Sequence, residues 1–201
     1  MTEPLEILVW PRDDEAIWAE RRRCGDFTAL DPGLLGAALC YLRTVADGDL
    51  ERWRLQQQRL VTPTTAVELA TGYYGVSSVL VLAQHYAARG PSAPAAIPCA
   101  RGGGIFAGAL AASRRTRGLS LTVVVVPPSA WHAELGIRGK RDDTIGPNNE
   151  RVPGRKTQAI QYAEGFAKGL HLPRARAERE ALADAYGVAA WWAFLLDEDA
   201  E

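Results

Sequence analysis

Three carboxylates in the sequence occupy positions where an apolar pattern ordinarily excludes charge. Asp31 ends the run DFTALD, Glu68 ends the shorter run TTAVEL, and Asp184 lies within ALADAYGVAAWW. Glu180 comes four residues before Asp184, so the two share one helical face. Taken alone, a carboxylate at the end of a strand is more often only a turn former or a helix cap. Whether these side chains lie close together in the fold decides whether they could act as one site.

Convergence of the four carboxylates would imply a bound metal. Their mutual repulsion would be severe unless they shared cations, and oxygen ligands without an accompanying His or Cys set favour Mg²⁺, with Mn²⁺ as an alternative. Two such ions about 4 Å apart activate water and stabilise the leaving oxygen during attack on a phosphodiester. If they converge, Asp31, Glu68, Glu180 and Asp184 are the carboxylates that would share the ions.

The charge of the chain is divided along its length. The net charge is only −1, but residues 84–176 carry 14 Lys and Arg against 5 Asp and Glu, a net charge of +9. Residues 1–31 carry 4 basic against 8 acidic side chains, and residues 178–201 carry 1 against 7. For an arbitrary protein such a pattern usually reflects solvated faces, whereas beside a metal site it indicates a surface for phosphates.

The first half of the chain predicts three adjacent strands. The runs DFTALD and LLGAALCYL are separated by Pro32 and Gly33, which indicates two strands joined by a tight turn. LERWRLQQQRLV alternates apolar and polar residues, as a half-buried third strand does. Before them, residues 1–25 contain a possible short strand, EILVW, and a charged helical stretch.

The second half predicts helices around one buried strand. LTVVVVPP is a continuous β-branched run, typical of a strand covered on both faces. The other expected elements are a helix over 76–88, a loop or insertion over 91–104, a helix at IFAGALAASRRTR, a mobile loop over 138–156 and two amphipathic helices at TQAIQYAEGFAKGL and EREALADAYGVAAWWAFLL. The predicted fold class is therefore α/β with a mixed central sheet flanked by helices.

Length and composition fit one soluble domain preceded by an extension. In this chain of 201 residues we expect an N-terminal extension over residues 1–25 and one domain over 26–201. No apolar run reaches the roughly 20 residues that cross a bilayer, and the N-terminus lacks an export signal. Three cysteines without CxxC spacing argue against disulfides and zinc, so a reducing cytoplasm is expected. GGGIFAG is not GxGxxG, which disfavours a dinucleotide site.

Five segments, taken in order, resemble the RuvC-type Holliday-junction resolvases. FTALDPGLLGAAL resembles the family's first strand, turn and second strand, in which the first catalytic aspartate lies. VELATGYYG resembles the family's glutamate segment, and VVVVPPSAW resembles its central strand. RKTQAIQYAEGFAKGLHLP resembles its basic loop with the following helix, and ALADAYGVAAWWA resembles its C-terminal acidic helix. Together they extend from about residue 26 to 193.

The resemblance implies a ribonuclease H-like fold and a homodimer that makes paired, magnesium-dependent nicks in four-way or other branched DNA. By motif position, Asp31, Glu68 and Asp184 take the catalytic metal-binding roles. The family commonly has a further carboxylate three residues before its last aspartate, where this chain has Ala181, and Glu180 is the candidate replacement. A branch-migration motor is a possible partner.

The resemblance also indicates which residues contact DNA. Lys156 lies where the family places a lysine near the scissile phosphate, and it is included with the catalytic residues. Aromatic side chains after the glutamate could stack on unpaired bases, although one of them is expected to pack in the core. The full expected DNA-contacting set is Tyr73, Tyr74, Arg114, Arg115, Lys140, Arg141, Arg151, Arg155 and Lys156.

Two other functions remain open at the level of the sequence. One is a non-catalytic protein of the same fold that binds branched DNA, because the altered fourth acidic position weakens metal binding. The other is a different ribonuclease H-like protein, such as an RNA–DNA hybrid nuclease or a phosphate-binding ATPase-like protein. Cleavage assays over several divalent metals and several nucleic-acid substrates separate these possibilities.

Overall fold

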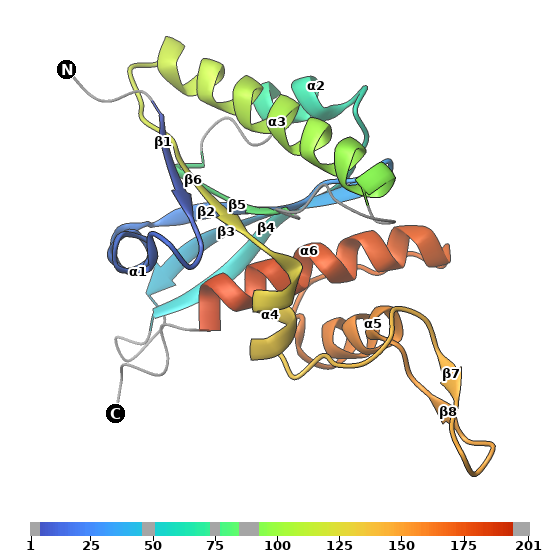
Figure 1. Ribbon diagram of the computed structural model, residues 1–201. Helices are drawn as coiled ribbons and strands as arrows, with labels where there is room; N and C mark the ends of the chain where they lie inside the picture. Colours follow the sequence, from blue (N-terminus) through green and yellow to red (C-terminus); the bar gives the residue numbers. More distant parts are fainter. Residues whose placement is uncertain (1–4, 46–50, 73–76, 85–92, 195–201) are drawn as a thin grey trace.

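A six-stranded mixed sheet forms the centre of the protein, with helices on both faces (Figure 1). The computed structural model describes residues 5–45, 51–72, 77–84 and 93–194. The strand order is β1-β6-β5-β2-β3-β4. The strands are β1 (Glu6–Val9), β2 (Asp26–Asp31), β3 (Gly36–Val45), β4 (Glu51–Val61), β5 (Val79–Ala83) and β6 (Thr122–Val126). The predicted fold class is confirmed.

Three consecutive antiparallel strands make one half of the sheet, as the sequence predicts. β2 pairs with β3 from Asp26↔Leu42 to Asp31↔Ala37, and β3 pairs with β4 along its whole length. The turn between β2 and β3 needs a glycine at Gly36, because a Cβ there would lie 2.3 Å from the carbonyl oxygen of Asp31. This turn fixes the backbone next to Asp31.

Parallel strands make the other half, and here one prediction is wrong. Residues 79–83 form β5 and not part of a helix over 76–88; the remaining residues of that prediction lie partly outside the described part of the chain. The run VLVLA is buried at every position between β2 and β6, which pair with it in parallel. A strand buried on both faces is uniformly apolar, so periodicity alone does not separate it from a buried helix.

The two faces of the sheet are covered by different helices. Figure 1 shows α2 and α3 on one side and α4, α5 and α6 on the other. Side chains of β2 and β5 alternate between the two apolar clusters: Ala29 and Val81 pack with α6, whereas Leu30 and Leu82 pack with α3. The helices are α1 (Asp14–Arg23), α2 (Ala66–Gly72), α3 (Ala93–Thr116), α4 (Pro128–Glu134), α5 (Arg155–Phe166) and α6 (Arg176–Phe194).

The stretch 91–104, expected to be a loop or insertion, is helical from residue 93 onward. α3 begins at Ala93 and continues through the predicted helix that follows. Its glycines allow the helix to lie close to the sheet, since a Cβ on Gly103 would meet Leu82 Cδ1 at 2.9 Å and Pro32 Cγ at 3.4 Å. Glycines that suggest the end of a helix in the sequence therefore allow α3 to pack closely against the sheet.

The segment 138–156, expected to be a mobile loop, contains a short hairpin and the start of α5. Strands β7 (Thr144–Ile145) and β8 (Arg151–Val152) pair antiparallel, and the hairpin projects from the body of the protein (Figure 1). Gly154 joins it to α5 in a tight approach, because a Cβ at this position would lie 2.3 Å from the carbonyl carbon of Asp142. Polar turn residues thus build a defined element here.

The segment before β2 adds to the same sheet and core. β1 pairs in parallel with β6, and Leu8 and Ile17 are buried. The guanidinium of Arg21 is buried and donates hydrogen bonds from Nε to the carbonyl oxygen of Trp192 at 2.5 Å and from Nη2 to that of Trp191 at 3.3 Å. The predicted boundary between residues 25 and 26 stays a prediction, but the strand and the helix expected within 1–25 are confirmed.

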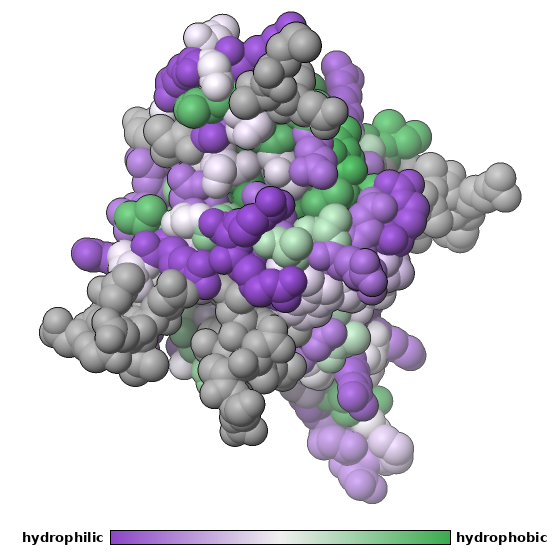
Figure 2. All heavy atoms as spheres, turned by 90° about the vertical axis from the view of Figure 1, so that its left-hand side faces the viewer, coloured by the Kyte–Doolittle hydropathy of each residue, from purple (hydrophilic) through white to green (hydrophobic). Residues whose placement is uncertain are grey.

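The surface on the side of β1 and α1 is a mosaic of hydrophilic areas and smaller hydrophobic areas (Figure 2). Among the residues described, no helix is long and apolar enough to span a membrane.

Candidate active site

Asp31 is the last residue of β2, at the edge of the sheet where the parallel strands β5 and β6 also end. Because side chains alternate along a strand, Asp31 points to the face that α6 covers, as Ala29 does two residues earlier. Asp31 is partly buried. A rigid strand therefore holds this partly buried carboxylate at the edge of the sheet.

Asp184 and Lys156 reach Asp31 from two helices. Asp184 lies in the middle of α6 and is 6% exposed, and Lys156 lies in the first turn of α5. The Lys156 ammonium donates a hydrogen bond to Asp184 Oδ2 and forms an ion pair with it. Gly187, one turn after Asp184, lets the ring of Trp131 pack directly on α6, since a Cβ there would lie 2.5 Å from the ring.

The pKa values show that these three groups share one electrostatic environment. Burial raises the pKa of Asp31 to about 8, and the negative charge of Asp184 adds to this effect while Lys156 opposes it. Burial also raises the pKa of Asp184 against the opposing effect of Lys156. Burial acts to lower the pKa of Lys156, but the charges of Asp184 and Asp31 raise it overall. Asp31, Asp184 and Lys156 therefore lie within electrostatic range of one another, and Lys156 contacts Asp184 directly; the prediction that the two aspartates share a metal stays a prediction.

Glu180 lies on α6 one turn before Asp184, as predicted, and faces the solvent side of the site. Its carboxylate accepts a hydrogen bond from Arg176 Nε at 2.8 Å. Its charge contributes to raising the pKa values of both Asp184 and Lys156, so it lies within their electrostatic range. Glu180 therefore flanks the pair of aspartates, and its direct partner is an arginine.

Glu68 is not with the aspartates, so the prediction that it shares a metal with them is wrong. TTAVEL does not end a strand: residues 66–72 form α2, on the sheet face opposite α6. Glu68 is exposed on this helix, whose buried residues Ala66, Leu69 and Ala70 pack towards α3 and the sheet. The apolar residues that resembled a strand are the buried stripe of a short helix.

Asp143 organises the hairpin next to Lys156. It accepts hydrogen bonds from the amide of Gly154 at 2.8 Å, from Thr157 Oγ1 at 2.7 Å and from Arg151 Nε at 2.7 Å. These hydrogen bonds lower the pKa of Asp143 to about 2, the one from the Gly154 amide having the largest effect, followed by those from Thr157 and Arg151. A carboxylate at the N-terminus of α5 also interacts favourably with the helix dipole. Asp143 thus fixes the turn of helix that carries Lys156.

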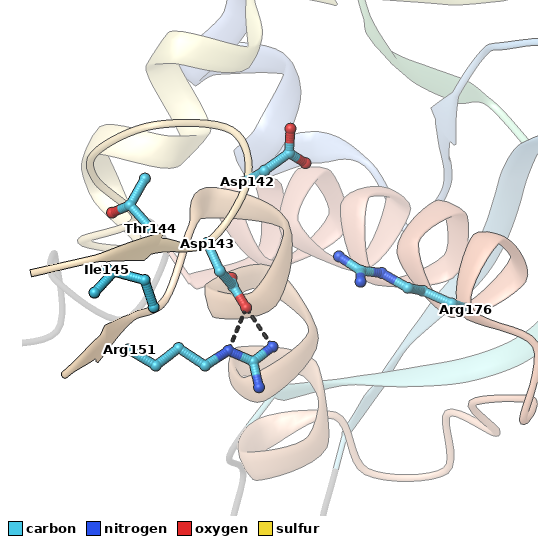
Figure 3. A pocket seen from close by; sticks show the side chains of 6 residues that line it. All are labelled: Asp142, Asp143, Thr144, Ile145, Arg151 and Arg176. Carbon is cyan, nitrogen blue, oxygen red and sulfur yellow. Dashed lines mark hydrogen bonds and ion pairs between the residues drawn. The ribbon is translucent and has the colours of Figure 1, made fainter. Parts of the chain in front are cut away.

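A shallow cavity of about 460 Å³ lies between the hairpin and α6. Figure 3 shows Asp143 linked to Arg151 across the hairpin, with Arg176 reaching from α6. The lining residues are Asp142, Asp143, Thr144, Ile145, Arg151 and Arg176. It adjoins the site through Arg176, the partner of Glu180.

The basic residues expected to contact DNA are divided between surface and core. Those on the hairpin or beside the site are Lys140, Arg141 and Arg151, which are exposed, and Arg155, which is partly buried at the start of α5. The charge of Arg141 acts on Asp184, which places Arg141 near the site. Arg115 is exposed at the C-terminal end of α3.

Arg114 is a correction to this set. It is 5% exposed, and its Nε donates a hydrogen bond to the carbonyl oxygen of Ser120 at 2.5 Å. Arg114 thus closes the turn after α3 and is not displayed to a ligand. Helical spacing alone did not show which of the two adjacent arginines faces inward.

Some predictions cannot be placed, and some contributors to the site were missed. Tyr73 and Tyr74 lie outside the described residues. Sequence reasoning missed Asp143, because an acidic residue in a basic segment resembles a solvated charge. It also missed Gln158, whose amide nitrogen donates to the carbonyls of Arg138 at 2.7 Å and Pro153 at 2.8 Å.

The donor set fits one hard divalent cation. Mg²⁺ is typically held by one or two carboxylates, with water and substrate phosphate oxygens as its other ligands. Asp31 and Asp184 supply two such carboxylates with raised pKa values in one place. No cluster of three or more His, Cys, Asp or Glu side chains suited to a metal occurs among the residues that the structure describes.

Comparison with known proteins finds similarity at the level of solved structures alone. No family model and no curated protein sequence matches the chain. Thermus thermophilus RuvC in complex with a Holliday junction substrate shares 15% identity, with 85% of this chain and 96% of that chain covered and a TM-score of 0.45, and a second structure of T. thermophilus RuvC gives the same values. The yeast mitochondrial Holliday junction resolvase Ydc2 shares 13% identity over 90% of this chain and 86% of that chain, with a TM-score of 0.35. The three solved structures compared above, to which this chain is similar in fold, are thus Holliday-junction resolvases, two of them RuvC.

Proposed function

We propose that this protein is a divalent-metal-dependent, structure-selective endonuclease that cleaves four-way or other branched DNA. The observation that carries the proposal is that Asp31, Asp184 and Lys156 lie within electrostatic range of one another where β2 ends. Two buried carboxylates with raised pKa values are costly to the fold unless they serve a ligand. A hard cation and a phosphate together satisfy this charge arrangement.

The residues of the site have separate tasks in phosphodiester hydrolysis. Asp31 and Asp184 would hold the cation, and Mg²⁺ bound there would supply Lewis-acid activation of the scissile phosphate and of the attacking water. The Lys156 ammonium neutralises charge on a non-bridging phosphate oxygen as it develops. The water oxygen forms a new bond to phosphorus, the bond from phosphorus to the leaving oxygen breaks, and the displaced water proton balances the leaving alkoxide.

The surroundings of the site suit a polyanion. Lys140, Arg141 and Arg151 are exposed on or beside the hairpin that leads into α5. Contacts from such side chains to phosphates hold nucleic acid in register without reading its sequence. The projecting hairpin widens this surface beyond the sheet edge (Figure 1), and a broad phosphate-binding surface suits DNA with several arms.

Assembly is a further part of the proposal. A homodimer would place two such sites on one junction, so that paired nicks could resolve it, and a branch-migration motor could deliver the junction. These steps take place on DNA in the cytoplasm. They rest on the resemblance of the sequence motifs, with the sheet-edge site as their structural support.

The test uses purified protein with Mg²⁺ and a set of labelled substrates: a four-way junction, a fork, a linear duplex and an RNA–DNA hybrid. We expect paired nicks in the junction and at least tenfold slower cleavage of the duplex and hybrid. Asp31→Asn should remove cleavage and leave junction affinity within about threefold, because the variant removes a metal ligand and no basic contact.

Other results would identify other functions. Tight junction binding without cleavage over Mg²⁺, Mn²⁺ and Co²⁺ would show a branched-DNA-binding protein; alanines at positions 83 and 181, beside the two aspartates, favour this second candidate. Preferential cleavage of the hybrid would show a different nuclease. Loss of junction binding in Asp31→Asn would contradict the assignment of Asp31 to chemistry.

A further inference from the structure

The position next to Asp31 on the neighbouring strand is an alanine. β2 and β5 are parallel, and Leu30 pairs with Leu82, so Ala83 lies beside Asp31 at the ends of the two strands. Ala83 belongs to the same apolar cluster as Ala29 and Val81, which pack with α6, so it points to the same face as Asp31. A methyl group therefore occupies the place from which a second strand could offer a carboxylate.

The position one turn before Asp184 on its buried side is also an alanine. Ala181 is 5% exposed and packs in the cluster beneath α6. Glu180, its neighbour, pairs with Arg176 instead of completing a cluster with the two aspartates. The residues that follow β5, 85–92, contain neither Asp nor Glu. Among the residues that the structure describes, the carboxylate oxygens of the site therefore come from Asp31 and Asp184.

A lysine supplies the remaining positive charge. A bound cation requires both carboxylates in their ionised form, and with the Lys156 ammonium they then carry a net charge of −1, which a single divalent cation brings to +1 before DNA binds. A second divalent cation would raise the net charge of the site to +3, and no further carboxylate among the described residues is in place to hold it. Mg²⁺ pairs in proteins are clamped by ligands on both ions, and within the described part of the chain the site has two carboxylates.

We propose that the active site takes one divalent cation per chain, held by Asp31 and Asp184, and that Lys156 stands where a second ion would otherwise lie beside the scissile phosphate. This inference rests on the proposed function and replaces the two-metal arrangement expected in the sequence. The chain thus has a one-metal-plus-lysine site, formed because Ala83 and Ala181 withhold the carboxylates that a second ion needs.

The test counts bound Mn²⁺ by the loss of the free-ion signal in electron paramagnetic resonance. The full-length protein and the double variant Asp31→Asn/Asp184→Asn, which lacks both metal-holding carboxylates, are titrated in parallel, each with an equal amount of four-way junction DNA, so that ions bound to DNA cancel in the difference. We expect wild type to bind one more Mn²⁺ per chain than the double variant. A difference of two would overturn this inference and leave the proposed nuclease function intact, whereas a difference of zero would overturn both.

Matched variants test the cause. Ala83→Glu should raise the count to two Mn²⁺ per chain, because it adds a carboxylate beside Asp31, and Ala83→Gln, which has the same shape without the charge, should leave it at one. An unchanged count in a folded Ala83→Glu protein, checked by circular dichroism, would contradict the role assigned to Ala83. If Ala83→Glu does not fold, the wild-type count still decides the number of ions.

Discussion

At the scale of single residues, the site contains two carboxylates whose removal from water destabilises their ionised forms. The charge of Lys156 offsets part of this destabilisation. Asp31 and Asp184 are drawn out of water near each other, and the pKa of each rises. Lys156 opposes both shifts. Sequence reasoning identified all three, because a carboxylate inside an apolar run is conspicuous and Lys156 lay in a recognisable motif. It also selected Glu68, because a short apolar run does not distinguish a strand from the buried stripe of a helix.

Asp31 should make the metal-free protein less stable as pH rises. Its pKa is about 8 in the folded chain and near its ordinary value of 3.8 in the unfolded chain, so between about pH 4 and pH 8 the folded state binds the extra proton. The stability of wild type should therefore fall across this window, and Asp31→Asn should abolish most of the fall. Urea denaturation with EDTA at pH 5.5, 7 and 8.5 measures this. We expect the advantage of Asp31→Asn to be largest at pH 8.5; an advantage that is independent of pH would contradict the assigned pKa.

At the scale of elements, the hairpin and α5 depend on one carboxylate. Asp143→Asn weakens the hydrogen bonds to the Gly154 amide and Thr157 and the ion pair with Arg151. We expect amide hydrogen exchange at Gly154 and the first turn of α5 to accelerate about tenfold, since each lost hydrogen bond contributes on the order of 1 kcal/mol. Asp142→Asn, at the exposed neighbouring position, is the control. Equal exchange rates in the two variants would show that Asp143 does not organise the hairpin.

The close approach of α3 to the sheet is the second element-scale feature. Gly103→Leu places a side chain against Leu82 and Pro32 and should destabilise the protein by about 2 kcal/mol, a typical cost of overpacking. Gly104→Leu, one residue along the same helix, enters open space and should be neutral or stabilising, because leucine favours helix over glycine. Thermal unfolding of the two variants measures the contrast, and similar melting temperatures would contradict the packing.

At the scale of the whole molecule, the segment before β2 is held to the last turns of α6 by hydrogen bonds from Arg21. The buried guanidinium of Arg21 binds carbonyl oxygens near the C-terminal end of α6 and lies 4.8 Å from the ring centroid of Trp18. Arg21→Ala should cost about 3 kcal/mol, because it leaves buried carbonyls without their donor and removes a cation–π contact. Arg22→Ala, at an exposed neighbouring position, should change stability by under about 0.5 kcal/mol. A small effect of Arg21→Ala in chemical denaturation would show that this segment is peripheral to the fold.

Local patterns in the sequence predicted the individual strands more reliably than they predicted which residues of different elements lie next to each other. The antiparallel half of the sheet, β6, α5 and α6 follow from alternation, β-branched runs and helical spacing. β5 was mistaken for a helix because it is buried on both faces, and the start of α3 for a loop because its glycines serve contacts with the sheet. Because β5 was predicted as a helix, the position of Ala83 beside Asp31 was not predicted. Neighbours across two parallel strands can be identified only when both strands and their register are known.

The most direct test of the account compares three carboxylate substitutions in one assay. Asp31→Asn, Asp184→Asn and Glu68→Gln are each assayed for cleavage of a four-way junction with Mg²⁺ under single-turnover conditions, with junction affinity measured in parallel. We predict that the first two lose at least 10²-fold in rate, as expected when a ligand that stabilises the transition state is removed, and that Glu68→Gln retains the wild-type rate. Undiminished cleavage by Asp31→Asn and Asp184→Asn, or loss of cleavage in Glu68→Gln alone, would contradict the active site described here.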